Sequence, residues 1–312
     1  MKKAQFFFAI ALSLLLSLSL AFAGHEFNVL TTKGDIKVKR ENSKKWETLD
    51  NGQKLFTKDQ IKIKKGAYLS LVHTNGNPIE VNKSGNYSVS KLLSKANTKK
   101  SDVTKKFTSF ILDELAESDD LLSSGDLSDD MSTLGATERA FVKNGINIRL
   151  PKSTYLIDNK IDISWYELKG ASSYKFTLRN PDDEVILSKE LNSTELSINL
   201  DELKVENGEC YYWSISADGK DSEEYCLFRM TTKTISEINN DVQNISNELG
   251  KDAALGQLVL ASYYAEKKVV NKAIKAFKTA IEISPDVEKY KFLYAKYLRS
   301  LGLEEEASKA MN

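Results

Sequence analysis

Residues that could carry out chemistry are few in this sequence, and they do not form a recognisable catalytic pattern. The chain of 312 residues contains two cysteines and two histidines. It lacks the G-x-S-x-G, HExxH and G-x-x-x-x-G-K patterns, which position nucleophiles, zinc ions and phosphates in many enzymes. A catalytic role would have to rest on Asp and Glu residues of the kind that any soluble protein contains. We therefore predict a protein that is not an enzyme and has no catalytic residue, metal or cofactor.

Whether the cysteines form a disulfide depends on which faces of their strands they occupy. Cys210 and Cys226 lie on expected strands joined by a turn, and a bond closing this loop would stabilise the fold by about 3 kcal/mol. Cys210 lies on the face opposite Tyr211, whereas Cys226 alternates in phase with Phe228 and Met230. If Phe228 and Met230 are buried, the sulfur atoms point apart unless a β-bulge intervenes. The sequence leaves this disulfide undecided.

Metal-binding patterns are missing as well. His25 and His73 stand without another ligand at the spacing of a zinc site. Aspartates are concentrated in an acidic stretch among serines, but they lack the alternating spacing of a calcium-binding loop; they are Asp119, Asp120, Asp126, Asp129 and Asp130. This composition cannot bury enough apolar surface to hold one conformation. We predict a flexible acidic linker.

The N-terminal residues predict export. Lys2 and Lys3 precede an apolar and serine run over residues 6–22, which ends in Ala21-Phe22-Ala23. This pattern is typical of a signal peptide, so we expect cleavage between Ala23 and Gly24. An uncleaved leader would be the only expected membrane contact. The mature protein is expected in the periplasm or on the cell surface of a bacterium, where disulfides can form.

Charge and length bound the remaining possibilities. The sequence has 44 basic and 44 acidic residues and so lacks the basic excess that nucleic-acid binding requires. We predict a multidomain α+β protein with a small N-terminal antiparallel β domain, a central β-sandwich and C-terminal all-α helical hairpins. The predicted ranges are 1–23 (signal peptide), 24–96 (β domain), 97–142 (amphipathic helix and acidic linker), 143–232 (sandwich) and 233–312 (helical repeats).

Residues 24–96 show the period-two alternation of half-buried strands, as at Ile36 and Val38 or at Ile61 and Ile63. The segment resembles the FecR-like periplasmic domain at Trp46, Leu49, Gly52, Leu55, Asp59 and Gly76. The resemblance implies an envelope β module that meets a partner. Lys58 departs from the family pattern, which has glycine before the aspartate.

An amphipathic helix is expected after this domain. Its apolar residues recur at helical spacing, with Lys105 and Lys106 on the outside; they are Val103, Phe107, Phe110, Ile111 and Leu115. Such a helix should dock against another part of the protein, because its apolar face would otherwise be exposed to water.

Residues 143–232 contain strand patterns at the spacing of a β-sandwich. The segments "ISW", "ASSYKFTLRN" and "LKVENGECYYWSISADG" resemble the B, C and F strands of fibronectin type III and related immunoglobulin-like domains. The resemblance makes Tyr211 the corner tyrosine. We interpret Trp165, Tyr174 and Trp213 as core residues, with a sugar-binding platform as the alternative.

The C-terminal residues contain an internal repeat. Ala273 and Ala307 are 34 positions apart, as are Ala261 and Ala295. Together with Tyr264, Phe277, Pro285 and Gly302, this spacing resembles the tetratricopeptide repeat, in which stacked helix hairpins bind other proteins. A helix from Ile235 to Leu249 is expected to cap the stack; the alternative is that the stack leans on the sandwich.

In that family, the first helix of each repeat lines a concave groove. The corresponding face here carries a candidate partner groove of Lys289, Phe292, Lys296 and Arg299, whose charges suit an acidic peptide or C-terminus. The alternative, which we prefer, is that the charges face solvent and Phe292 packs inward.

The resulting hypothesis is a non-enzymatic envelope protein that mediates protein–protein assembly, with another envelope protein as its partner. A second hypothesis is a periplasmic ligand-sensing or signalling accessory that uses the FecR-like module. A third is a carbohydrate- or peptidoglycan-binding module based on the sandwich.

Overall fold

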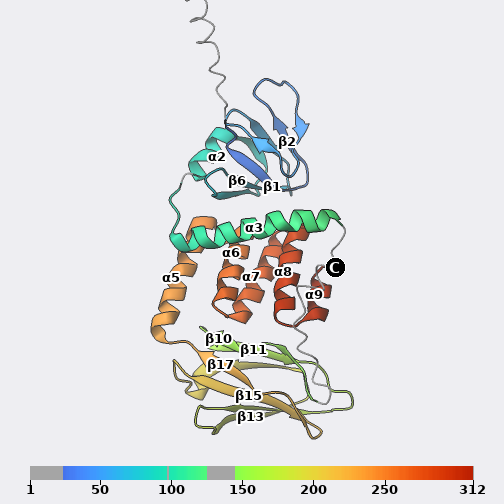
Figure 1. Cartoon of the computed structure of the whole chain (residues 1–312), viewed down its shortest axis with the longest axis vertical. Coiled ribbons are helices and arrows are strands. Elements are labelled where there is room, and N and C mark those ends of the chain that lie inside the picture. Colours follow the sequence, from blue (N-terminus) through green and yellow to red (C-terminus); the bar gives the residue numbers. More distant parts are fainter. Residues whose placement is uncertain (1–23, 97, 125–144, 312) are drawn as a thin grey trace, which may run out of the picture. The chain divides into compact units, whose positions relative to one another are not determined.

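The computed structural model of the chain describes residues 24–96, 98–124 and 145–311. The predicted signal peptide, Ala23 and the linker aspartates Asp126, Asp129 and Asp130 lie outside this range. The chain forms two compact units, one running to Asn75 and including Val81–Asn97, the other made of Gly76–Glu80 and Thr98–Asn312. The predicted multidomain α+β fold class is confirmed, with antiparallel sheets, a sandwich and C-terminal helices (Figure 1).

The N-terminal β domain consists of short strands in antiparallel sheets. One sheet has the order β4-β1-β6-β7 and the other β3-β2-β5-β8. The strands and the helix that follows are β1 (Phe27–Lys33), β2 (Ile36–Lys39), β3 (Glu47–Thr48), β4 (Lys54–Leu55), β5 (Gln60–Ile63), β6 (Tyr68–His73), β7 (Pro78–Val81), β8 (Gly85–Ser88) and α2 (Val89–Ala96). The predicted alternation is present, since Ile36, Val38, Ile61 and Ile63 are all buried.

Several of the positions at which the sequence resembles the FecR-like pattern have structural roles in this domain. Leu49 and Leu55 are buried in the core. The buried carboxylate of Asp59 accepts a hydrogen bond from the backbone N–H of Phe56 at 3.0 Å and pairs with Arg40 at 2.7 Å. A buried carboxylate needs such partners. The side chain of Asp59 thus closes a turn by bonding the backbone of Phe56 and pairing with Arg40.

The sandwich is built from β9 (Ile148–Leu150), β10 (Thr154–Leu156), β11 (Lys160–Trp165), β12 (Tyr174–Arg179), β13 (Val185–Leu191), β14 (Glu195–Asn199), β15 (Cys210–Ala217), β16 (Lys220–Asp221) and β17 (Tyr225–Arg229). One sheet has the order β14-β11-β9, and the other β10-β17-β15-β12-β13 with β16 beside β15. Trp165, Tyr174 and Trp213 are buried between the sheets. They therefore belong to the core, and the alternative of a sugar-binding platform made of these rings is wrong.

Tyr211 has the geometry expected of a corner tyrosine. Its phenolic oxygen accepts a hydrogen bond from the backbone N–H of Glu206 at 2.7 Å. This bond ties the start of β15 to the loop before it, as in sandwiches of the fibronectin and immunoglobulin type.

The cysteines are joined by a disulfide, Cys210–Cys226. The parity argument against the bond was wrong, because the fully buried residue of β17 is Leu227, opposite Tyr211. Cys226 lies opposite Tyr212, and Cys210 lies opposite Phe228. Both cysteines therefore occupy the outward face of adjacent strands, where their side chains can meet diagonally without a bulge.

The helical residues form α5 (Thr232–Leu249), α6 (Ala254–Glu266), α7 (Val270–Ile283), α8 (Glu288–Ser300) and α9 (Glu304–Met311). Residues 34 apart are equivalently buried, as Ala261 and Ala295 or Ala273 and Ala307 show. We call α6–α9 the hairpin stack, made of the hairpins α6–α7 and α8–α9. Helix α5 ends at Gly250, which has a φ of +93°, and packs against α6 as a cap.

The sandwich and the hairpin stack belong to one compact unit, although the sequence predicts separate domains. The hydroxyl of Thr154 donates to the carbonyl of Lys268 and accepts from the N–H of Val270, each at 3.1 Å. Tyr166 donates to Glu306 at 2.7 Å, and burial together with this carboxylate raises the pKa of the Tyr166 phenol. The bonds of Thr154 satisfy backbone groups between α6 and α7, and the bond of Tyr166 joins the sandwich to α9.

Helix α3 (Asp102–Ser124) completes this unit. It includes Asp119 and Asp120, which the sequence assigns to the flexible linker, so the helix is longer than predicted. Within the described residues, no helix combines the length and the apolar character that crossing a membrane would require.

Candidate binding site

The predicted docking helix lies on the hairpin stack. Helix α3 contacts α5, α6 and α8, and it lies across them in Figure 1. Its buried apolar residues Phe107, Ile111 and Leu115 recur every four positions, which places them on one face of the helix. Phe110 was predicted on this face but is 50% exposed. The apolar face is therefore narrower than the sequence indicates.

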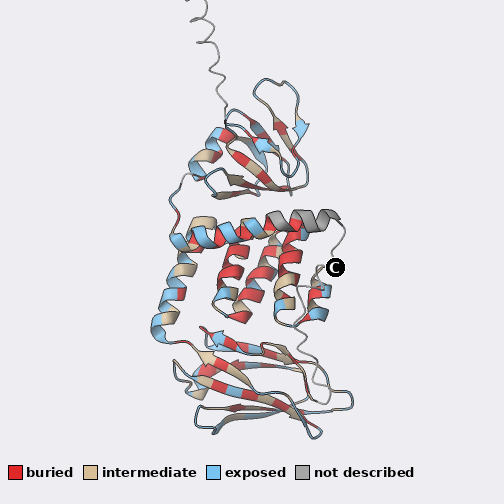
Figure 2. Cartoon of the chain, viewed as in Figure 1, coloured by how far each residue is buried: buried red, intermediate tan, exposed pale blue. Residues whose placement is uncertain are grey.

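The stack helices that α3 covers are themselves strongly apolar. Figure 2 shows α6, α7 and α8 largely in the colour of buried residues. Helix α6 has buried residues around most of its circumference, including Leu255 and Leu258. A helix that is apolar all round needs neighbours on every side, and α3, α5 and α7 supply them.

The N-terminus of α3 is held by a polar cluster. Glu248 of α5 accepts hydrogen bonds from the backbone N–H of Ser101 at 3.0 Å and from its hydroxyl at 3.1 Å. The ammonium group of Lys100 donates to the carbonyl of Glu248, and burial lowers the pKa of Lys100. A carboxylate at a helix N-terminus is favourable because free N–H groups point toward it. This end of α3 is thus firmly attached.

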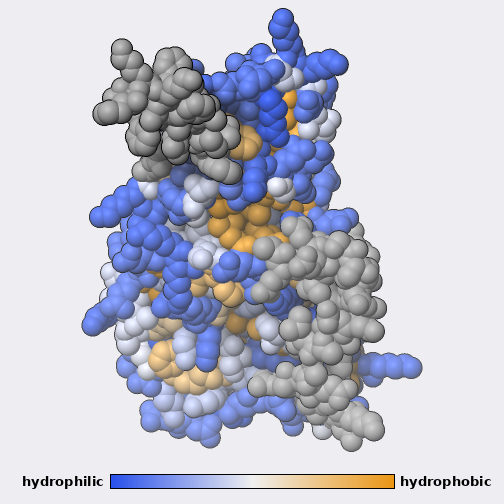
Figure 3. All heavy atoms as spheres, turned by 45° about the horizontal axis from the view of Figure 1, so that its top comes forward, coloured by the Kyte–Doolittle hydropathy of each residue, from blue (hydrophilic) through white to orange (hydrophobic). Residues whose placement is uncertain are grey.

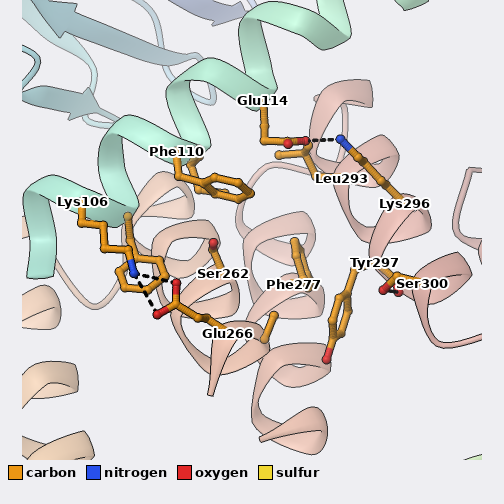
Figure 4. A pocket seen from close by; sticks show the side chains of 13 residues that line it. Lys106, Phe110, Glu114, Ser262, Glu266, Phe277, Leu293, Lys296, Tyr297 and Ser300 are labelled. Carbon is orange, nitrogen blue, oxygen red and sulfur yellow. Dashed lines mark hydrogen bonds and ion pairs between the residues drawn. The ribbon is translucent and has the colours of Figure 1, made fainter. Parts of the chain in front are cut away.

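Further along α3, ion pairs connect the helix to the stack (Figure 4). Lys106 lies 2.7 Å from the carboxylate of Glu266 on α6, and Glu114 lies 2.6 Å from the ammonium group of Lys296 on α8. The Lys296–Glu114 pair is partly buried, where screening by water is weaker than at the surface. These pairs fix the direction in which α3 lies on the stack.

Between the ion pairs, α3 and the stack leave a pocket of about 350 Å³. Its walls are mainly apolar, and Figure 4 shows the rings of Phe110, Phe277 and Tyr297 around it. Phe277 and Tyr297 stack with their ring centroids 5.3 Å apart. The residues that line it are Lys106, Phe107, Phe110, Ile111, Glu114, Ser262, Ala265, Glu266, Phe277, Leu293, Lys296, Tyr297 and Ser300. Pockets of this size and character commonly bind apolar groups.

We call the face of the stack under α3 the α3 groove, defined by Ser262, Glu266, Phe277, Leu293, Lys296 and Tyr297. Figure 3 shows that some hydrophobic residues of the chain reach the surface among hydrophilic neighbours. Burial raises the pKa of the Tyr297 phenol, so this residue is a neutral hydrogen-bonding group at physiological pH. The groove can therefore hold an apolar ligand with polar groups at its ends.

The predicted partner groove does not exist as an open surface. Phe292 is buried, as the preferred alternative expects, but Lys289 is buried too, so the expectation that the charges face solvent is wrong for this residue. Arg299 pairs with Glu304 at 3.1 Å, and Lys296 pairs with α3. Of the four residues predicted for the partner groove, Lys296 lines the α3 groove, whereas Lys289, Phe292 and Arg299 do not.

Sequence reasoning missed Glu114, Glu266, Leu293 and Tyr297 as members of a site. Helix α3 and α8 are far apart in sequence, with 182 positions between Glu114 and Lys296. The available signal was the amphipathic helix itself, which must dock on an apolar face, together with the charges beside that face.

A second cavity of about 830 Å³ lies between β11, β14 and α7. Lys272 and Asp158 form an ion pair at this cavity, and the amide of Asn271 donates to the carbonyl of Asp162 at 3.4 Å. Its lysines are Lys160, Lys272, Lys275 and Lys278, and its carboxylates are Asp158, Asp162, Glu195 and Glu282. The balanced charges give it no electrostatic preference for an anion or a cation.

His73 has its contacts within the N-terminal β domain. His73 accepts a hydrogen bond from the backbone N–H of Asn75 at 3.1 Å, and its ring packs edge-on against Phe27. The part of the chain that the structure describes contains no group of three or more His, Cys, Asp or Glu side chains able to hold a metal ion.

Comparison with known proteins does not identify a family. No protein-family model matches the chain, and no curated protein matches it. Among solved structures, the fn3 domain of human collagen alpha-1(XX) is 13% identical, with a TM-score of 0.23, and the match covers 31% of this chain and 95% of that domain. The fn3 domain of human contactin 1 is 12% identical, with a TM-score of 0.20 and coverages of 31% and 92%. A β-1,2-glucanase from Parabacteroides distasonis is 11% identical, with a TM-score of 0.22 and coverages of 56% and 35%. Similarity this limited assigns no activity.

Proposed function

We propose that this chain is a non-enzymatic binding or scaffold protein of a bacterial cell envelope, and that its hairpin stack contacts another envelope protein. The observation that supports the proposal is the α3 groove. Its apolar wall and flanking charges hold an amphipathic helix through Phe107, Ile111 and Leu115. A surface of this composition is typical of helix-in-groove recognition.

The resemblance of the stack to tetratricopeptide repeats and that of the β domain to FecR-like domains agree with this role. In the proposal, the stack provides the contact surface and the sandwich supports it through the hydrogen bonds of Thr154 and Tyr166. The proposed location follows from the N-terminal sequence, and it predicts a mature chain that begins at Gly24. Fractionation followed by N-terminal sequencing tests that point.

The main test is partner capture from native envelopes with a single charge reversal in the groove. We expect Lys296→Glu to reduce the captured partner at least tenfold, because a partner that uses the groove meets a reversed charge beside the pocket. Lys291→Glu on the same helix is the matched control, since Lys291 does not line the pocket. Equal capture by both variants would contradict the proposal.

Point variants are preferable to removal of the helical end. Deleting residues 233–312 would also remove the hydrogen-bonding partners of Thr154 and Tyr166. Buried polar groups left without partners destabilise a fold, so a truncated chain could lose its partner through misfolding alone.

A further inference from the structure

The fit between α3 and the α3 groove is incomplete. Among the residues of α3 whose burial is described, half of the buried ones carry hydroxyl groups, namely Thr104, Thr108 and Ser118. The hydroxyl of Thr108 is buried and has no hydrogen-bond partner among the described residues. The neighbouring pocket of about 350 Å³ is partly open to solvent and is not filled by the described side chains, and Phe110 beside it is 50% exposed. An unpaired buried hydroxyl weakens a contact, and side chains that border an unfilled pocket lose packing partners on one side.

The charges that border the groove define which helix fits it. Glu266 and Lys296 pair with Lys106 and Glu114 of α3. A helix that lies in this direction therefore needs a basic residue and, eight positions or about two turns later, an acidic residue. Between them it needs apolar residues four positions apart, as at Phe107 and Ile111.

We propose that α3 is a replaceable internal occupant of the α3 groove, and that the partner is a protein with an amphipathic helix of this same charge and apolar pattern. The partner helix also carries a bulky apolar side chain that fills the pocket beside Phe277 and Tyr297. This inference rests on the proposed function. The N-terminal attachment of α3 at Glu248 keeps the displaced helix close, so it returns when the partner leaves.

The test measures replacement with a defined probe, a fluorescently labelled peptide of residues 98–118 of this chain. Its binding to the full mature chain is followed by fluorescence anisotropy. We expect Glu114→Lys in the chain to tighten peptide binding about tenfold, because it opposes Lys296 with a like charge and loosens the internal helix. Asp113→Lys is the matched control, since Asp113 is exposed on the same helix, and it should leave peptide binding unchanged.

A second variant should change peptide binding in the opposite direction. Because it is expected to stabilise the internal helix, its effect cannot be explained by misfolding. Thr108→Val removes the unpaired hydroxyl while keeping the shape of the side chain. It should tighten the internal helix and weaken peptide binding about threefold. A peptide with Phe107→Ala and Ile111→Ala should not bind any variant.

The groove itself is tested by exchanging charges between chain and peptide. A Lys296→Glu chain should bind a Glu114→Lys peptide more tightly than the unmodified peptide. Equal peptide affinity of the Glu114→Lys and Asp113→Lys chains would overturn the inference. Dimerisation of the chain in place of peptide uptake would also overturn it, because the occupant would then be a second copy.

The inference and the proposed function fail in different ways. If Lys296→Glu abolishes partner capture while the backbone amides of α3 stay protected from hydrogen exchange in the complex, the partner binds over α3 and only the inference is wrong. If the peptide exchanges as expected but Lys296→Glu and Lys291→Glu capture the partner equally, the proposed function is wrong.

Discussion

The core of the sandwich and the contact between α3 and the hairpin stack differ in how completely they bury their apolar side chains. In the sandwich, Trp165, Phe176 and Trp213 are completely buried and belong to one hydrophobic cluster. Under α3, Phe110 stays half exposed and a pocket remains. Dense packing supports a single, stable arrangement, whereas a loosely packed contact opens at a lower free energy. The comparison predicts that the sandwich core contributes more to stability than the α3 contact and that the α3 contact opens more easily.

The largest effect should come from opening the sandwich core. Trp213→Ala should lower the free energy of unfolding by about 4 kcal/mol, because it removes a large buried ring and leaves a cavity. Denaturant titration measures the loss. The control is Tyr212→Ala, since Tyr212 is the next residue and faces outward at 40% exposure; it should cost less than about 1 kcal/mol. Equal losses of stability in the two variants would contradict the assignment of Trp213 to the buried face and Tyr212 to the outward face of β15.

Removing the disulfide should have the next largest effect. Cys210 and Cys226 are 16 positions apart, so replacing both by serine should reduce stability by about 3 kcal/mol through loop entropy in the unfolded chain. Thermal unfolding of the natural chain with a reductant should show the same decrease. The serine variant should not respond to reductant, and a response would point to another cause.

Alanine substitutions in α3 should lower the free energy of unfolding by amounts that depend on the burial of the side chain. Phe107→Ala should cost about 2 to 3 kcal/mol, near the lower limit for a buried phenylalanine, because the adjacent pocket already allows its neighbours to relax. Phe110→Ala should cost less than about 1 kcal/mol. Equilibrium unfolding and hydrogen exchange of α3 measure both. A large loss for Phe110→Ala would show that the pocket is filled in solution.

Alkaline pH should weaken the hairpin stack by a smaller amount. Burial, with help from Asp158 and Glu306 respectively, raises the pKa of Tyr264 and Tyr294 to about 12. The folded state therefore keeps protons that the unfolded state loses above about pH 10. Stability is complete below that pH and decreases as the pH rises toward 12, by about 1 kcal/mol per tyrosine near pH 11.

Urea unfolding at about pH 9 and pH 11 measures this difference, and tyrosinate absorbance follows the ionisation. Tyr294→Phe should remove part of the dependence. An unchanged slope in this variant would mean that the alkaline loss arises elsewhere in the chain.

Local patterns predicted the elements of this protein well. Strand alternation placed Ile36, Val38, Ile61 and Ile63 in a core, because a period of two can bury only one face of a strand. The 34-residue spacing of Ala261 and Ala295 predicted equivalent buried positions in successive hairpins. These features depend on residues close in sequence or on a fixed period, and both are visible without the fold.

Faces that depend on a neighbour were less predictable. The sequence left open whether Phe228 belongs to the interior of β17, and the structure places Leu227 there. Alternation gives two possible faces, and only the pairing with β15 selects one of them. The same limit left the disulfide undecided, because its formation depends on that selection.

The sequence by itself determined that an amphipathic helix precedes the sandwich and that stacked hairpins follow it. Tertiary structure alone decided that this helix covers the stack, that Lys296 pairs with Glu114 and that an apolar pocket remains between them. The physical reason is that an apolar helical face specifies burial but not its partner. The partner is chosen by shape and charge between segments separated by more than 100 positions, here 182 between Glu114 and Lys296.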